Sequence, residues 1–204
     1  LSRKGQHVSL SDHRLRNRQE PMWLQANRYT QTHLNRYHRY WLVDEGSLTN
    51  RLIKVANSSF RIQPLTQSWQ VPLPSEQRLL NLKPRQLAVV REVFLICKDQ
   101  PWVFARSVIP ANILNGPLRR LHYLKNKSLG ALLFNTPSMK RAPFQLAKMA
   151  GNCNYLPAEV HQAQQLWGRR SRFLLYDKPL IVSEVFLPEF TPWPRTPNIT
   201  IPKL

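Results

Sequence analysis

Two pairs of apolar segments, each joined by a short polar turn, constrain the fold of this chain more than any other feature. Residues 88–97 and 102–109 flank the first turn, and residues 172–176 and 180–187 flank the second. Segments of this length, rich in β-branched and aromatic residues and bounded by turn residues, predict antiparallel β-hairpins. Because helical segments lie between and before the two hairpins, we expect an α+β fold in which a single antiparallel sheet is flanked by helices.

Serine caps mark two of the predicted helices. Ser47 precedes residues 48–55 and Ser128 precedes residues 129–134, and serine readily accepts a hydrogen bond from the first turn of a helix. Apolar spacing, or a proline in the first turn, predicts three more helices at residues 22–43, 117–124 and 157–166. Alternation broken by prolines predicts short edge strands within residues 60–74, and a further strand is expected at 141–148.

The charge of the chain points to an anionic partner. Lys and Arg number 30 against 11 Asp and Glu, which gives a formal net charge of +19. A chain of 204 residues is long enough for one core. We divide it into a basic, partly helical N-terminal extension at residues 1–40, a core domain at 41–188 and a proline-rich, extended tail at 189–204. No apolar run is long enough to span a bilayer and the start lacks the apolar stretch of a signal peptide, so we expect a cytoplasmic protein.

Four charged residues interrupt otherwise apolar strands: Arg91, Glu92, Arg106 and Glu184. Strand side chains alternate between two faces, so each charge has apolar neighbours and needs a partner or a ligand. From the residues alone, a cross-strand ion pair such as Glu92 with Arg106 is favoured over a ligand site. The three arginines within residues 166–172 fit either an anion site or a solvated turn, and charge alone favours the turn.

Several classes of site have no support in the sequence. Phosphate-binding loops, dinucleotide-binding glycine motifs, zinc-protease motifs and serine-hydrolase elbows are all missing. His33 and His38 are five residues apart and do not share a helix face, so no metal is expected. The aromatic and basic signature of RNA-binding domains is also missing, and we expect no nucleic-acid partner.

Six motifs in colinear order carry a resemblance to a known family. They are Trp41–Arg51 (WLVDEGSLTNR), Arg91–Cys97 (REVFLIC), Pro101–Pro110 (PWVFARSVIP), Leu129–Gly130 with Phe134, Leu166–Arg172 (LWGRRSR) and Ser183–Pro188 (SEVFLP). Together they resemble the motifs of the chorismate pyruvate-lyase family across residues 41–188. The resemblance implies a buried ligand cavity enclosed by the sheet and its helices. It also implies conversion of chorismate to 4-hydroxybenzoate and pyruvate, the opening step of ubiquinone biosynthesis, without cofactor or metal.

The resemblance further implies roles for five residues of this chain. Arg91 would pair with the ring carboxylate, and Glu184 would meet the ring hydroxyl at the opposite end. The backbone N–H groups of Leu48 and Leu129 would complete these contacts, and Arg106 would be a weaker candidate for the enolpyruvyl carboxylate. Arginine suits planar carboxylates, and chorismate carries two of them. An apolar pocket would favour the protonated form of Glu184, so this residue and Arg91 are the candidate catalytic residues.

A second function fits the same expected fold. A sensing domain would bind a small anion of the hydroxybenzoate type and do no chemistry, but it needs a DNA-binding module, and residues 1–40 contain no evident helix-turn-helix. A basic nucleic-acid-binding protein ranks third and rests on charge alone. We expect a monomer. The net charge is larger than a dianionic substrate requires. Two explanations remain open: electrostatic steering of the substrate, and peripheral association with anionic membranes.

Overall fold

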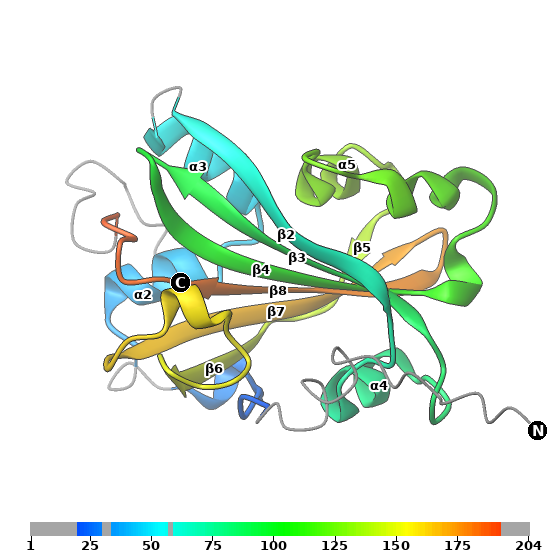
Figure 1. The fold of residues 1–204 in the computed structure, drawn as a ribbon, viewed down its shortest axis with the longest axis horizontal. Helices are drawn as coiled ribbons and strands as arrows, with labels where there is room; N and C mark the ends of the chain where they lie inside the picture. The colour runs from blue at the N-terminus through cyan, green and yellow to red at the C-terminus, as the bar shows by residue number, and fades with distance from the viewer. Residues whose placement is uncertain (1–19, 30–33, 57–58, 193–204) are drawn as a thin grey trace, which may run out of the picture.

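A single antiparallel sheet forms the centre of the molecule (Figure 1). The computed structural model describes residues 20–29, 34–56 and 59–192. The strands are β1 (Leu24–Gln25), β2 (Phe60–Gln70), β3 (Ala88–Cys97), β4 (Gln100–Pro110), β5 (Lys140–Arg141), β6 (Gln145–Ala150), β7 (Gln165–Leu175) and β8 (Lys178–Phe186). Their order across the sheet is β1-β6-β7-β8-β4-β3-β2, with β5 paired to β7. The last strand in sequence, β8, therefore lies in the middle of the sheet.

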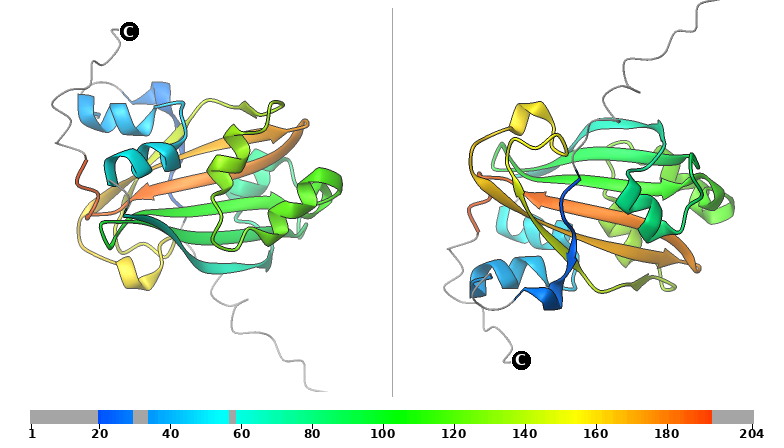
Figure 2. Two further views of the ribbon diagram at one scale, coloured as in Figure 1. Left: turned by 90° about the horizontal axis from the view of Figure 1, so that it is seen from above. Right: turned by 90° about the horizontal axis from the view of Figure 1, so that it is seen from below.

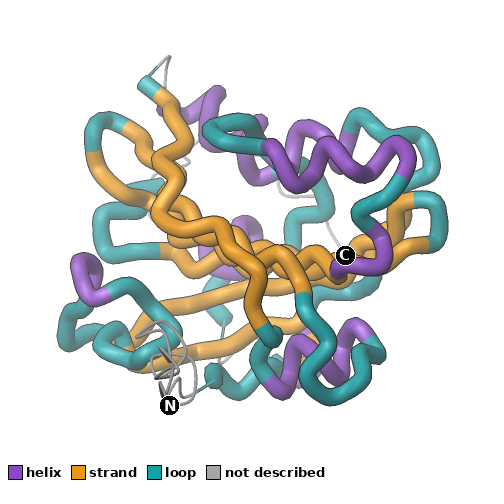
Figure 3. The backbone as a smooth tube through the Cα atoms, turned by 45° about the vertical axis from the view of Figure 1, so that its right-hand side comes forward, coloured by secondary structure: helices purple, strands orange, loops and turns teal. Residues whose placement is uncertain are grey.

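Helices cover both faces of this sheet (Figures 2 and 3). The α-helices are α2 (Arg36–Leu42), α3 (Leu48–Ala56), α4 (Pro74–Leu80) and α5 (Leu129–Phe134). The short 3-10 helices are η1 (Ala26–Arg28), η2 (Ala111–Ile113), η3 (Gly116–Tyr123) and η4 (Ala158–Val160). In Figure 2, α2, α3 and α5 lie in front of the sheet in one view and α4 lies in front in the opposite view. No helix in the described part of the chain is long and apolar enough to cross a membrane.

The alternation of side chains along β3 divides the core between the two faces. Val93 and Leu95 pack with residues of α2 and α3, whereas Phe94 and Ile96 pack on the opposite side. All ten residues of β3 are buried because helices or loops cover both of its faces. Burial of this kind excludes water from any charged group on the strand.

Both predicted hairpins are confirmed. β3 pairs with β4 and β7 pairs with β8, each as antiparallel neighbours. However, β7 begins at Gln165, so residues 166–172 belong to a strand, and the expectation of a solvated turn there is wrong. Arg169 and Arg170 are both buried, at 1% and 5% exposure.

The two helices with serine caps are also confirmed. Ser128 Oγ accepts a hydrogen bond from the N–H of Ala131 at 3.0 Å at the start of α5. Ser47 Oγ accepts one from the N–H of Asn50 at 3.3 Å at the start of α3. Each helix thus begins where the sequence places its cap.

Other predicted elements differ from the structure. Among the described residues of the range 22–43, only α2 is α-helical, because Leu24 and Gln25 pair with β6 and Asn35 caps a new start. The 3-10 helix η3 (Gly116–Tyr123) replaces the helix predicted at 117–124, and only 158–160 of the predicted helix at 157–166 are helical. The segment 60–74 holds one long edge strand, β2, followed by the unpredicted helix α4. The predicted strand at 141–148 is divided into β5 and β6 around Pro143. Most of the N-terminal extension and of the proline-rich tail lies outside the described residues.

Candidate functional site

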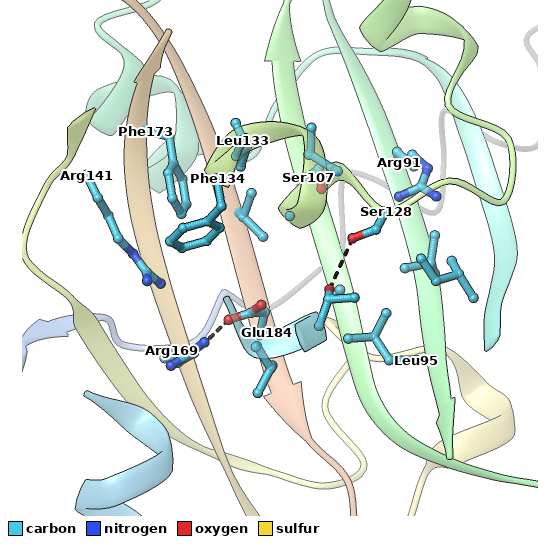
Figure 4. Close-up of a pocket in the computed structure, with 18 of the residues that line it drawn as sticks. Arg91, Leu95, Ser107, Ser128, Leu133, Phe134, Arg141, Arg169, Phe173 and Glu184 are labelled. Carbon is cyan, nitrogen blue, oxygen red and sulfur yellow. Dashed lines mark hydrogen bonds and ion pairs between the residues drawn. The ribbon is translucent and has the colours of Figure 1, made fainter. Parts of the chain in front are cut away.

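A pocket lies between the sheet and the N-terminal ends of α3 and α5 (Figure 4). Its apolar wall includes Val93, Leu95, Ala105, Leu133, Phe134 and Phe173. Its charged residues come from four different strands: Arg91 on β3, Arg141 on β5, Arg169 on β7 and Glu184 on β8. A pocket with apolar walls and a few convergent charged groups is the usual form of a small-molecule site.

Arg91 is a buried cation in this pocket, with 3% of its surface exposed. One of its terminal nitrogens, Nη2, donates to the carbonyl oxygens of Lys125 and Lys127 at 2.9 and 3.1 Å. Its Nε is buried and has no hydrogen-bond partner in the described structure. Burial lowers the pKa of Arg91 to about 10, so it remains charged at neutral pH. No carboxylate pairs with it among the described residues, so its charge is not compensated by an ion pair within this part of the chain.

Glu184 and Arg169 form an ion pair across the β7–β8 ladder. Arg169 Nε donates to Glu184 Oε2 at 2.6 Å, and the two residues are register partners. Arg169 Nη1 also donates to the carbonyl oxygens of Trp41 and Asp44 at 2.8 and 3.1 Å, which fixes the guanidinium. The expected apolar surroundings of Glu184 therefore include a charged partner, Arg169. Its second oxygen, Oε1, accepts no hydrogen bond from the described residues.

Arg141 is a third cation at the pocket. Its Nε donates to Ser171 Oγ and its Nη1 to the carbonyl oxygen of Glu45, both at 3.1 Å. The guanidinium carbon lies 3.9 Å from the centre of the Phe144 ring. Burial, and secondly the positive charge of Arg169, lower the pKa of Arg141 to about 10.

The ends of α3 and α5 meet at the edge of the pocket. Ser128 Oγ donates to Thr49 Oγ1 at 3.1 Å, which joins the first turns of the two helices. A Cβ atom on Gly130 would lie 3.3 Å from Thr49 Oγ1, so glycine permits this close approach. Leu48 and Leu129 line the pocket as the first residues of these helices, where backbone N–H groups have no intrahelical acceptor.

Arg106 does not line this pocket. Its register partner is Glu92, whereas Arg91 is opposite Ser107, so the two arginines point to opposite faces of the sheet. The Arg106 guanidinium is fully buried between Glu76 at 2.7 Å and Glu92 at 2.7 Å. The cross-strand pair of Glu92 with Arg106 is confirmed, and Glu76 of the unpredicted helix α4 completes it. The expectation that Arg106 binds the enolpyruvyl carboxylate is therefore wrong.

Comparison with known proteins identifies the family. A family model described as Chorismate lyase matches residues 17–195. The chain belongs to the chorismate lyase family. A probable chorismate pyruvate-lyase of Pseudomonas aeruginosa (strain UCBPP-PA14) is 45% identical over 152 residues, covering 72% of this chain and 82% of that protein. One of Nitrosospira multiformis is 40% identical over 157 residues, covering 74% of this chain and 86% of that protein.

The fold is similar to that of a solved structure with little sequence identity. The effector domain of PhnF from Mycobacterium smegmatis superposes with a TM-score of 0.51 at 13% identity, covering 71% of this chain and 90% of that domain. This similarity concerns the fold alone. It supports an α+β arrangement of one antiparallel sheet with helices.

Of the five residues expected at the site of this chorismate lyase family member, four line the pocket: Arg91, Glu184, Leu48 and Leu129. Two further charged residues of the pocket, Arg141 and Arg169, were not predicted from the sequence. Arg169 lies in the arginine-rich segment 166–172, but that segment is part of strand β7 and not the expected turn. Arg141 had no signal, because its place at the pocket depends on β5 pairing with β7. Across the described residues no group of three His, Cys, Asp or Glu side chains could hold a metal ion.

Proposed function

We propose that chorismate is bound and cleaved in the pocket between the sheet and helices α3 and α5. Chorismate pyruvate-lyase activity, which forms 4-hydroxybenzoate for ubiquinone biosynthesis, is the activity of this family and of this chain. The observation that supports the location is a buried arginine without a carboxylate partner, Arg91, in the same apolar pocket as the carboxylate of Glu184. We further propose that the pocket encloses its ligand and that the reaction needs no cofactor.

The strands set the distance between the two ends of the ligand. Arg91 lies on β3 and Glu184 on β8, with β4 between them and a register offset of two residues, so their backbones are about 12 Å apart. Both side chains line the same pocket, and the ring of the ligand would lie between them. The ring carboxylate would meet Arg91 and the hydroxyl on the opposite carbon would meet Glu184. The N–H groups of Leu48 and Leu129 would complete these contacts from the helix ends.

The reaction demands little of the protein. A proton leaves the ring carbon that bears the hydroxyl, and the bond between the neighbouring carbon and the ether oxygen breaks. The ring becomes aromatic, and the departing enolpyruvate takes up a proton and becomes pyruvate. Glu184 Oε1, which Arg169 leaves without a hydrogen bond, can hold the hydroxyl or move a proton there. Arg91 and the apolar wall orient the ring and exclude water.

Incubation of the purified protein with chorismate, without metal or nucleotide, tests the proposal. We expect equal amounts of 4-hydroxybenzoate and pyruvate, and loss of both in Arg91→Ala. Arg61→Ala is the matched control, because Arg61 is an exposed arginine on the edge strand β2 and does not line the pocket. Tight binding of 4-hydroxybenzoate without turnover would instead identify a sensing domain, and full activity of Arg91→Ala would move the site elsewhere.

A further inference from the structure

The charges in the pocket do not balance. Three arginines, Arg91, Arg141 and Arg169, share it with one carboxylate, Glu184. Glu184 pairs with Arg169 at 2.6 Å, and no carboxylate pairs with the other two arginines within the described residues. Arg91 is buried and Arg141 is half-buried, and neither forms an ion pair with a carboxylate of the described residues, although Glu184, Asp44 and Glu45 act on Arg141 from a longer distance. Two such cations in one pocket are complementary to a ligand with two negative charges.

These two cations lie at opposite ends of the site. In Figure 4, Arg91 is at one side of the pocket and Arg141 at the other, with Glu184 between them. Their strands agree with this view, because β5 pairs with β7, and β8 and β4 separate β7 from β3. Arg141 is near enough to both Glu184 and Arg169 for their charges to alter its pKa. The cation beyond Glu184 is therefore Arg141.

The surroundings of Arg141 hold its guanidinium in place and leave part of it unused. Ser171 Oγ and the Glu45 carbonyl oxygen accept from Nε and Nη1. The guanidinium carbon lies 3.9 Å from the ring centre of Phe144 and 4.9 Å from that of Phe173. Nη2 makes no hydrogen bond to any described residue. A guanidinium held in this way can bind an anion with little loss of conformational entropy.

We infer that Arg141 binds the carboxylate of the enolpyruvyl ether and thereby makes the pocket select the dianionic substrate over its monoanionic product. This inference rests on the proposed function. In chorismate the ether is on the carbon next to the hydroxyl, so its carboxylate lies at the Glu184 end when the ring carboxylate is at Arg91. The ring product lacks this second carboxylate. Arg141 therefore contributes to binding before cleavage and not to holding 4-hydroxybenzoate afterwards.

Arg141→Met tests this role, since methionine keeps an apolar stem against the phenylalanines and removes the charge. We expect kcat/KM for chorismate to fall by about 10- to 100-fold, the value of one charge-assisted hydrogen bond, while the Kd of 4-hydroxybenzoate changes by less than about threefold. Lys140→Met is the matched control, because Lys140 is the neighbouring cation on β5 and its side chain is 71% exposed. Equal losses for substrate and product would overturn the inference.

A pair of unreactive probes separates this inference from the proposed function. 3-Carboxymethoxy-4-hydroxybenzoate carries a carboxylate in the place of the enolpyruvyl carboxylate, and 3-methoxy-4-hydroxybenzoate lacks it. We expect the wild-type protein and Lys140→Met to bind the first probe about 10-fold more tightly, and Arg141→Met to bind both equally. Arg141→Lys keeps the positive charge but lacks the planar guanidinium, so it should retain part of the preference. This variant replaces Arg141→Met in the test if the methionine variant does not fold.

The probe-binding and turnover experiments can fail independently of each other. A wild-type protein with no preference, or a preference that survives in Arg141→Met, would overturn the role of Arg141 even if chorismate is cleaved. Failure to form 4-hydroxybenzoate from chorismate would overturn the proposed function, whatever the two probes show.

Discussion

The carboxylate of Glu184 has one oxygen bound to Arg169 and the other without a hydrogen bond from the described residues. Glu184→Gln keeps the size of the side chain but removes its charge and its ability to take a proton. We expect kcat to fall by about 10²- to 10⁴-fold, the usual contribution of acid–base catalysis. Glu189→Gln, the same change at an exposed position, is the control. Turnover at the wild-type rate would leave Glu184 as an anchor only.

The buried guanidinium of Arg106 compensates two carboxylates, those of Glu76 and Glu92. Arg106→Met would leave both of them buried without a cation. We expect the free energy of unfolding to fall by about 3–5 kcal/mol in urea titrations. Adding Glu76→Gln and Glu92→Gln should restore part of this loss, because the uncompensated charges are then gone. If the single variant is as stable as the wild type, the network does not stabilise the fold.

The caps of α2 and α5 provide a comparison between a helix at the site and one away from it. Ser128→Ala removes the cap of α5 and its bond to Thr49, whereas Asn35→Ala removes the cap of α2, which does not line the pocket. We expect each change to lower the free energy of unfolding by about 1 kcal/mol. Only Ser128→Ala should weaken 4-hydroxybenzoate binding, as measured by calorimetry. Equal affinities in the two variants would show that the α5 cap does not shape the site.

Local patterns in the sequence were sufficient for some elements and not for others. The hairpins and the serine-capped helices depend on neighbouring residues, and their positions were predictable. Alternation placed Arg91 and Arg106 on apolar strands, but only the register of the β3–β4 ladder shows that they point to opposite faces. Arg141 reaches the pocket through the pairing of β5 with a strand more than 30 residues later. Pairings between residues so far apart in the sequence leave no local pattern, which explains why Arg141 and Arg169, half of the charged groups at the site, were not predicted.

The charge of +19 exceeds what the site uses, and we expect it to attract the dianionic substrate from solution. Raising the ionic strength from about 0.01 M to about 0.5 M should lower kcat/KM for chorismate and leave kcat nearly constant, because salt screens the long-range field. Assays of product formation at a series of neutral salt concentrations give kcat and kcat/KM at each ionic strength. If kcat/KM does not vary with salt, the net positive charge does not speed the association of chorismate.

The accessibility of the Cys97 thiol shows whether the end of β3 stays packed in the folded sheet. It is fully buried at the end of β3, and burial raises the pKa of its thiol to about 12. Because the folded state holds this proton more tightly than the unfolded state does, its contribution to stability is present below about pH 9 and is lost as the pH rises toward 12. In Cys153→Ser protein at neutral pH we therefore expect iodoacetamide to label Cys97 only in urea. Rapid labelling of the folded protein would show that β3 opens locally.

The central position of β8 has a consequence for the synthesis of the protein. As the chain leaves the ribosome, the β3–β4 hairpin and the strands β6 and β7 can form first, but the edges of β4 and β7 have no partner until residues 178–186 arrive. Glu184 arrives on the same strand, so the pocket acquires its carboxylate in the step that joins the two halves of the sheet. Until then the nascent chain exposes two unpaired edges that can pair with other chains, and this is the stage at which it most needs a chaperone.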